Sequence, residues 1–185
     1  QTELVGPANI KLAHPGFNGV LQILDINDQP FDSTAFGQGL GIEVTVAQGT
    51  WVFDAATDLS SVSQFTMNGA TSVTMSADQL VDLATALAMT GEMDAFVSEM
   101  GGVINITGLT QAHADWSIEF DGNPYNFTDL LEKLTSKGLT GTITLAEDVN
   151  LAESNWGIAD HLGFAFILGD GMTLGLATQE QADGL

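Results

Sequence analysis

The stretch Phe65-Thr-Met-Asn-Gly-Ala-Thr-Ser-Val-Thr-Met-Ser-Ala-Asp-Gln-Leu80 carries most of the information about the fold. It predicts a strand, a turn at the Asn-Gly pair, a second strand around Val73-Thr-Met75 and then the start of a helix. Ser76 and Gln79 have the Ser-x-x-Gln spacing of a capping box, in which each side chain satisfies a free backbone N–H. One such unit cannot bury its own apolar face, so we expect it to stack against similar units.

Similar strand pieces recur along the chain, at intervals of about 30 residues with one longer step. The segment Phe166–Gln181 also resembles Phe65–Leu80 after a shift of one residue. We therefore predict a mainly β fold with two or three helices, built as an irregular β-solenoid or as stacked short strands. The alternative is a plain α+β domain whose strands happen to be similarly spaced. The recurring pieces are Val44-Thr-Val46, Val73-Thr-Met75, Ile104-Asn-Ile106, Ile143-Thr-Leu145 and Leu174-Gly-Leu176.

Helices are expected to interrupt these strands at three places. The first helix begins at the Ser76 cap and ends near Gly91, with leucines at helical spacing on one face. A second, short helix is expected over residues 93–100. The third is expected to begin at an Asn126 cap and to end at Gly138, a residue type that commonly closes helices.

The charge balance excludes several classes of partner. The chain has 185 residues with 24 acidic side chains and 3 lysines, giving a formal net charge of −21. Nothing here could displace counterions from phosphates, which excludes a nucleic-acid binder and disfavours docking on an anionic membrane. No apolar run reaches the roughly 18 residues of a membrane span. We therefore expect no nucleic-acid partner and no membrane span.

The composition also indicates where the protein works. Cysteine is absent, which excludes disulfides and thiolate metal sites. Few cations with many Gly, Thr, Asp and Asn residues are typical of secreted bacterial surface proteins, so we expect a secreted or cell-surface location. A halophilic cytosolic protein would share the acidity. Because the chain starts at Gln1 and stops inside a repeat-like unit, we expect it to be a fragment of something longer.

The N-terminal third differs from the rest of the chain. It has little periodicity and contains a Gly-rich stretch at 37–41. We expect a linker or strand segment over residues 1–41 and a β-rich, repeat-like domain over residues 42–185.

A candidate calcium site lies in the first of these segments. The run Asp25-Ile-Asn27-Asp28 follows a strand-like stretch and resembles the Asp-x-Asn-Asp strand end of cadherin-type repeats. That resemblance implies calcium ligation by Asp25, Asn27 and Asp28, with Asp32 as a further ligand, because calcium takes six to eight oxygens in a flexible geometry. The alternative is a polar turn in which Pro30 stops the strand.

The repeat pieces are similar to another family. Runs such as Val73–Gln79 and Ile143–Asp148 resemble repeats of large secreted bacterial surface proteins of the adhesin and S-layer type. The resemblance covers residues 42–185 and implies a non-enzymatic structural module, used in adhesion or in self-assembly into a layer or filament. Its partners would be other copies or neighbouring repeats of the same chain. A viral or phage coat protein would fit the assembly hypothesis too.

The sequence contains few features that resemble known catalytic motifs. The imidazoles are His14, His113 and His161, and the sequence has no Gly-x-Ser-x-Gly elbow and no His-Glu-x-x-His. Acidic pairs are plentiful, but no spacing favours one of them for glycoside hydrolysis. We therefore predict no catalytic residues and no enzyme.

A glycan site is the main alternative to a purely structural role. Aromatic rings could stack on sugars while nearby carboxylates and amides bind the hydroxyl groups. The opposite interpretation is that Trp116, Ile118 and Phe120 alternate as the buried face of a strand. The densest candidate group is Trp116, Glu119, Asp121, Asn123 and Tyr125.

Stacked repeats with open ends should also associate with one another, because uncovered strand edges are templates for pairing. We expect the open ends near Val44 and over residues 172–185, unless the proline-containing segment 1–16 folds over one end as a cap.

Overall fold

The computed structural model describes residues 8–12, 18–21, 42–46, 49–53, 55, 57–60, 62–67, 71–90, 101–151 and 163–176. Within these ranges, the first sheet is three-stranded and parallel. It consists of β1 (Ala8–Leu12), β3 (Ile42–Val46) and β5 (Val62–Met67), in that order. Its central strand is β3. The strand at Val44 is therefore not an open edge, because β1 and β5 occupy its two sides, and β1 belongs to segment 1–16, the part of the chain expected as a possible cap.

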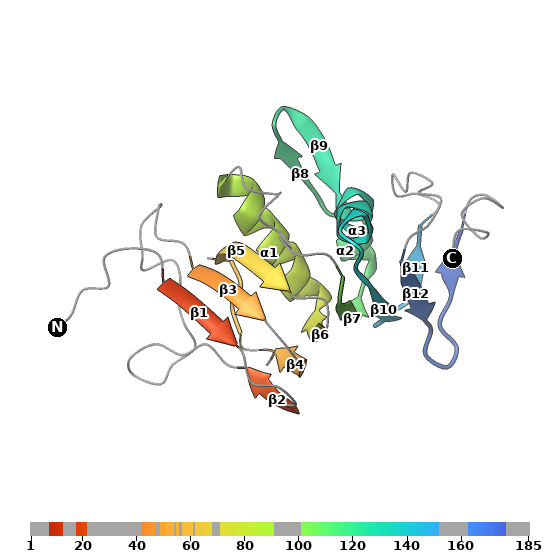
Figure 1. The fold of residues 1–185 in the computed structure, drawn as a ribbon. Helices are drawn as coiled ribbons and strands as arrows, with labels where there is room; N and C mark the ends of the chain where they lie inside the picture. The colour runs from red at the N-terminus through yellow and green to blue at the C-terminus, as the bar shows by residue number, and fades with distance from the viewer. Residues whose placement is uncertain are drawn as a thin grey trace.

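The second sheet is the largest element of the fold. It is six-stranded and parallel, with the order β12-β10-β7-β6-β4-β2, so that neighbours in the sheet follow the order of its strands in the chain. From β1 to β6 the chain alternates between the two sheets (Figure 1). The strands of the second sheet are β2 (Asn18–Leu21), β4 (Gly49–Phe53), β6 (Thr71–Ser76), β7 (Val103–Leu109), β10 (Thr140–Leu145) and β12 (Phe164–Ile167).

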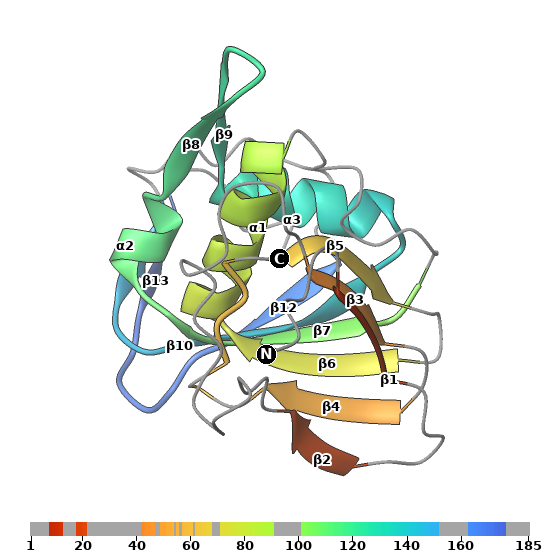
Figure 2. The same ribbon diagram turned by 90° about the vertical axis from the view of Figure 1, so that its left-hand side faces the viewer.

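Two smaller pairs complete the strands. The parallel pair joins β11 (Val149–Asn150) to β13 (Leu174–Gly175). The antiparallel pair joins β8 (Ser117–Phe120) to β9 (Asn123–Asn126) in a hairpin that projects from the molecule (Figure 2).

Three helices lie among these strands: α1 (Ala77–Thr90), α2 (Gln111–Ala114) and α3 (Phe127–Ser136). Figure 2 shows α1, α3 and the three-stranded sheet on one side of the six-stranded sheet. No helix or strand that the structure describes covers the other side of the middle strands β6, β7 and β10. The six-stranded sheet therefore has one packed face and one face without a described layer. No helix within the described ranges has the length and apolar character needed to cross a membrane.

Both long helices begin as the sequence predicts. The backbone N–H of Gln79 donates to Ser76 Oγ at 3.1 Å, and the N–H of Ser76 donates to Gln79 Oε1 at 3.0 Å. The same reciprocal pair joins Asn126 and Asp129, at 3.0 and 2.8 Å. Gly138 has φ of 77°, a left-handed conformation suited to a residue just beyond a helix. The helix expected over 93–100 lies outside the described residues, and the short α2 was not expected.

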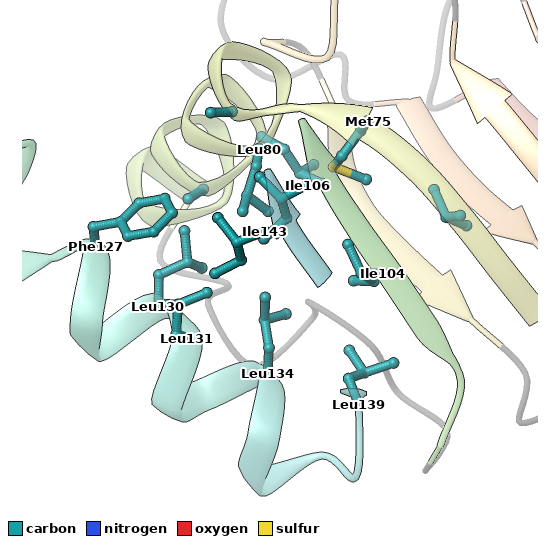
Figure 3. Packing of buried hydrophobic residues seen from close by; sticks show 14 of the residues in the cluster. Met75, Leu80, Ile104, Ile106, Phe127, Leu130, Leu131, Leu134, Leu139 and Ile143 are labelled. Atoms are coloured by element: carbon teal, nitrogen blue, oxygen red, sulfur yellow. The ribbon is translucent and has the colours of Figure 1, made fainter. Parts of the chain in front are cut away.

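The core lies between the packed face of the six-stranded sheet, the three-stranded sheet and the helices. In Figure 3 the leucines of α3 point toward the isoleucines of β7 and β10. Leu130, Leu134, Ile104, Ile106 and Ile143 are all completely buried. Burying each such side chain contributes about 1.5–3 kcal/mol, so this layer holds the helices on the sheet.

The strand register explains part of the predicted repeat. Val73 pairs with Ile104 and Met75 with Ile106, as the spacing predicts. Ile143, however, pairs with Ile106, a shift of two residues from the sequence alignment. The remaining two pieces lie in other sheets, Val44-Thr-Val46 in the three-stranded sheet and Leu174-Gly-Leu176 beside β11.

The prediction of a mainly β fold with a few helices is confirmed. The finer prediction of a solenoid is not shown, since the sheets do not close. Ladders between β1 and β3, and between β2 and β4, run across the predicted boundary between residues 41 and 42. That boundary stays a prediction.

Candidate functional site

The side of the six-stranded sheet that faces away from the helices carries a regular array of polar side chains. Successive side chains of a strand point to opposite faces, and in β6 the buried residues alternate with half-buried ones. The same alternation continues into β7 and β10. We call the outward set the outer face. It comprises Thr50, Val52, Ser72, Thr74, Ser76, Val103, Asn105, Thr107, Thr140, Thr142, Thr144, Ala165 and Ile167.

None of the outer-face residues is ionisable, although the chain carries 24 acidic side chains. Eight of them are Thr or Ser, one is Asn, and the other four are small or branched apolar residues. The parallel register aligns them in rows across the strands. One row runs Thr74, Asn105, Thr142 and Ala165 from β6 to β12. The outer face is thus a neutral, hydroxyl-rich grid.

A shallow, open depression of about 390 Å³ lies on this face over β7, β10 and the start of β12. At its polar centre, Thr142 Oγ1 donates to Asn105 Oδ1 at 2.9 Å. No charged side chain lines it. The lining residues are Val103, Asn105, Thr140, Gly141, Thr142, Gly163, Phe164 and Ala165.

Four of the five predicted glycan residues lie on the β8–β9 hairpin, and Trp116 directly precedes it, but the hairpin divides them. Tyr125 is directly opposite Ile118, and Asn123 is opposite Phe120, so these four side chains share one face. Glu119 is opposite Pro124 on the other face. Asp121 lies in the turn between the strands, with φ of 50°.

The aromatic rings of the hairpin pack against one another. The rings of Trp116 and Tyr125 meet edge to face at 6.4 Å, and those of Phe120 and Tyr125 at 6.2 Å. All three rings are partly buried against the core. For Trp116 and Phe120 this agrees with the alternative interpretation, in which Trp116, Ile118 and Phe120 form the buried face of a strand. The hydroxyl of Tyr125 donates to the Asp129 carbonyl at 3.2 Å, and burial raises the pKa of this phenol well above its usual range. The rings therefore anchor the hairpin at the start of α3.

His113 joins α2 to α1. Its Nδ1 accepts the backbone N–H of Thr110 at 3.2 Å and lies 2.7 Å from Thr110 Oγ1. Because Nδ1 accepts, Nε2 carries the proton and donates to Asp78 Oδ1 at 2.9 Å. Hydroxyl, imidazole and carboxylate follow one another as in a hydrolytic triad. Here, however, the imidazole caps a helix, and the Asp78 side chain is 82% exposed.

Asp82 is one turn further along α1. Partial burial raises the pKa of its carboxyl group above the usual value, and the negative charges of Asp58 and Asp78 add to the effect. His113 acts in the opposite direction. Partial burial, together with Asp78 on the same helix and Asp58 before β5, therefore destabilises the ionised form of Asp82.

The candidate calcium ligands Asp25, Asn27, Asp28 and Asp32 lie outside the described residues, and calcium binding there stays a prediction. His14 and His161 also lie outside them. Within the described ranges, no group of three or more His, Asp or Glu side chains is placed to hold a metal ion.

Sequence reasoning missed the outer face. The pattern was present in Thr140-Gly-Thr142-Ile-Thr144, where a Thr occupies every second position. The strand pieces were predicted from their apolar residues alone, and the polar residues between them carried no prediction. The match between neighbouring strands depends on register, which the sequence does not specify.

A scan against protein-family models, a search of curated proteins and a search of solved structures each find no match for this chain.

Proposed function

We propose that this chain is a non-enzymatic structural module of an extracellular surface protein, which stacks end to end with neighbouring repeats or with other copies of itself. The observation that carries the proposal is the order of the six-stranded sheet. Within this sheet, each strand from β2 to β12 lies beside the strand that precedes it in the sheet's chain order, and every neighbouring pair is parallel. A sheet that grows in this way can be extended by a further strand of the same kind.

The end of the sheet at β12 is where extension would occur. Among the described strands, β12 pairs only with β10, and β13 pairs only with β11. Ile167 is 47% exposed and Leu168 is 43% exposed at the end of β12. An uncovered edge with exposed apolar side chains favours pairing with another strand. This supports an irregular solenoid as the architecture of the assembled protein.

Sedimentation over a wide concentration range tests the proposal at low and high salt. We expect association that strengthens with salt, because the Debye length falls to about 10 Å near 0.1 M and screens the net negative charge. The variant Ile167→Glu should weaken association about tenfold, an effect of roughly 1.4 kcal/mol.

Val52→Glu is the matched control. Val52 is 41% exposed and lies on the same sheet, but on β4, which has neighbours on both sides. The Val52→Glu variant carries the same added negative charge as Ile167→Glu and should leave association unchanged. A chain that stays monomeric at every concentration and salt level would contradict the proposal, and equal effects of the two variants would place the contact on the face and not on the edge.

A further inference from the structure

The outer face has a property that end-to-end stacking does not use. It spans five strands of a protein with net charge −21 and carries no ionisable group. Neutral residues are therefore concentrated on one side of the sheet, and the carboxylates of the described residues all lie off this face. Such a separation favours a neutral partner, because an ionic ligand would find no opposite charge here.

The geometry of the face is periodic in two directions. Neighbouring strands are about 4.8 Å apart, and alternate residues of one strand are about 6.6 Å apart. Two aligned rows are Ser76–Thr107–Thr144–Ile167 and Thr74–Asn105–Thr142–Ala165. Threonine is stiff about χ1, so each such position presents a hydroxyl and a methyl group in a restricted orientation. A repeating grid of this kind suits a repeating partner.

Three kinds of partner fit less well. A sugar chain usually stacks on aromatic rings, and the outer face has none. A second copy is already proposed to pair at the free edge of β12, and that contact does not involve the strands β4, β6 and β7 of this face. A small ligand needs a concave pocket with converging polar groups, whereas the depression over β7 and β10 is shallow and open.

We propose that the outer face binds the surface of ice. The hydroxyl groups of Ser76, Thr107 and Thr142 already bond within the protein. The hydroxyls of Thr74, Thr140 and Thr144 and the amide nitrogen of Asn105 hold water molecules at regular intervals. The methyl groups, Val52 and Ile167 keep disordered water away. Each water-mediated contact is weak, but a rigid grid makes many of them at once without further loss of conformational entropy. The neutral face matches a neutral lattice, and the described carboxylates, which lie off this face, keep the bound protein in contact with the liquid.

An assay of ice recrystallisation with the full chain tests this proposal. We expect the chain to slow the growth of ice grains and to shape single crystals, and serum albumin at equal concentration to do neither. The double variant Thr107→Lys/Thr140→Lys places two charges at exposed positions of the face. It should need at least about tenfold more protein for the same inhibition.

Ser117→Lys/Thr173→Lys is the control, since it adds the same charge at exposed positions off the outer face. It should inhibit as well as the unchanged chain. If circular dichroism shows that the first lysine variant is unfolded, Thr74→Ala/Thr144→Ala removes hydroxyl and methyl groups with less disturbance and should show the same loss. Inhibition no better than that of albumin would overturn the proposal. Equal effects of the two lysine variants on ice growth would also overturn it. The same holds if Thr107→Lys/Thr140→Lys loses self-association but keeps its ice activity.

Discussion

At the scale of single residues, Asp82 offers a pH-dependent test. Its folded-state pKa lies above the ordinary value of 3.8, so ionisation destabilises the folded protein as pH rises through that pKa. We expect Asp82→Asn to raise the melting temperature at pH 7. The gain should disappear below pH 3.8, where the carboxyl is protonated in both states. An equal gain at pH 7 and at pH 3 would show that burial of the charge is not the cause.

The fate of individual residues shows what local sequence can predict. The capping pairs at Ser76 and Asn126 were predictable because both partners lie within one turn of helix. The candidate glycan residues of the β8–β9 hairpin were predictable as a cluster in the sequence. That Glu119 and Tyr125 lie on opposite faces of the hairpin depends on which residues pair across the strands. Gly141 shows the same limit, since a Cβ there would overlap the Ile104 carbonyl of the neighbouring strand.

At the scale of elements, the capping box of α1 should contribute measurable stability. Ser76→Ala removes the acceptor for the Gln79 N–H and should lower the free energy of unfolding by about 1 kcal/mol. Ser72→Ala is the matched control, because Ser72 lies four residues earlier on the outer face, and its effect should stay within about 0.5 kcal/mol. Urea unfolding measures both values. Equal losses would mean that Ser76 acts through something other than the cap.

The elements that sequence reasoning missed have a common cause. The five strand pieces and the two long helices follow from the spacing of apolar residues, and these were predicted, whereas β4 and β11 were not. The helix α2 has only four residues, too few for a periodic pattern. Its cap joins Thr110 to His113, which also contacts Asp78 in α1. The two-residue shift of β10 could not be read from its strand sequence either, because it is a relation between β10 and β7.

At the scale of the whole molecule, the sequence predicts that strands stack but not in which sheet. Among the described residues, the step from β6 to β7 holds α1, whereas the step from β7 to β10 holds α2, the hairpin and α3. Both steps return the chain to the next position in the same sheet. The outer face follows from this regularity, because only strands that return in parallel register align their threonines into rows.

The net charge leads to the last prediction. With 3 lysines against 24 acidic side chains, most carboxylates have no cation of the chain to pair with, so the folded protein repels itself. Screening this repulsion should stabilise the compact state, and the melting temperature should rise with sodium chloride in the absence of divalent ions.

A charge-reduced variant separates screening from other effects of salt. Glu119→Gln/Glu132→Gln removes two exposed negative charges, one on the hairpin and one on α3. It should melt higher than the unchanged chain at low salt, and its melting temperature should rise less steeply with sodium chloride. Differential scanning calorimetry at a fixed protein concentration measures both, so that self-association does not contribute. A flat or falling response of the unchanged chain would mean that its carboxylates lie too far apart for their repulsion to affect stability.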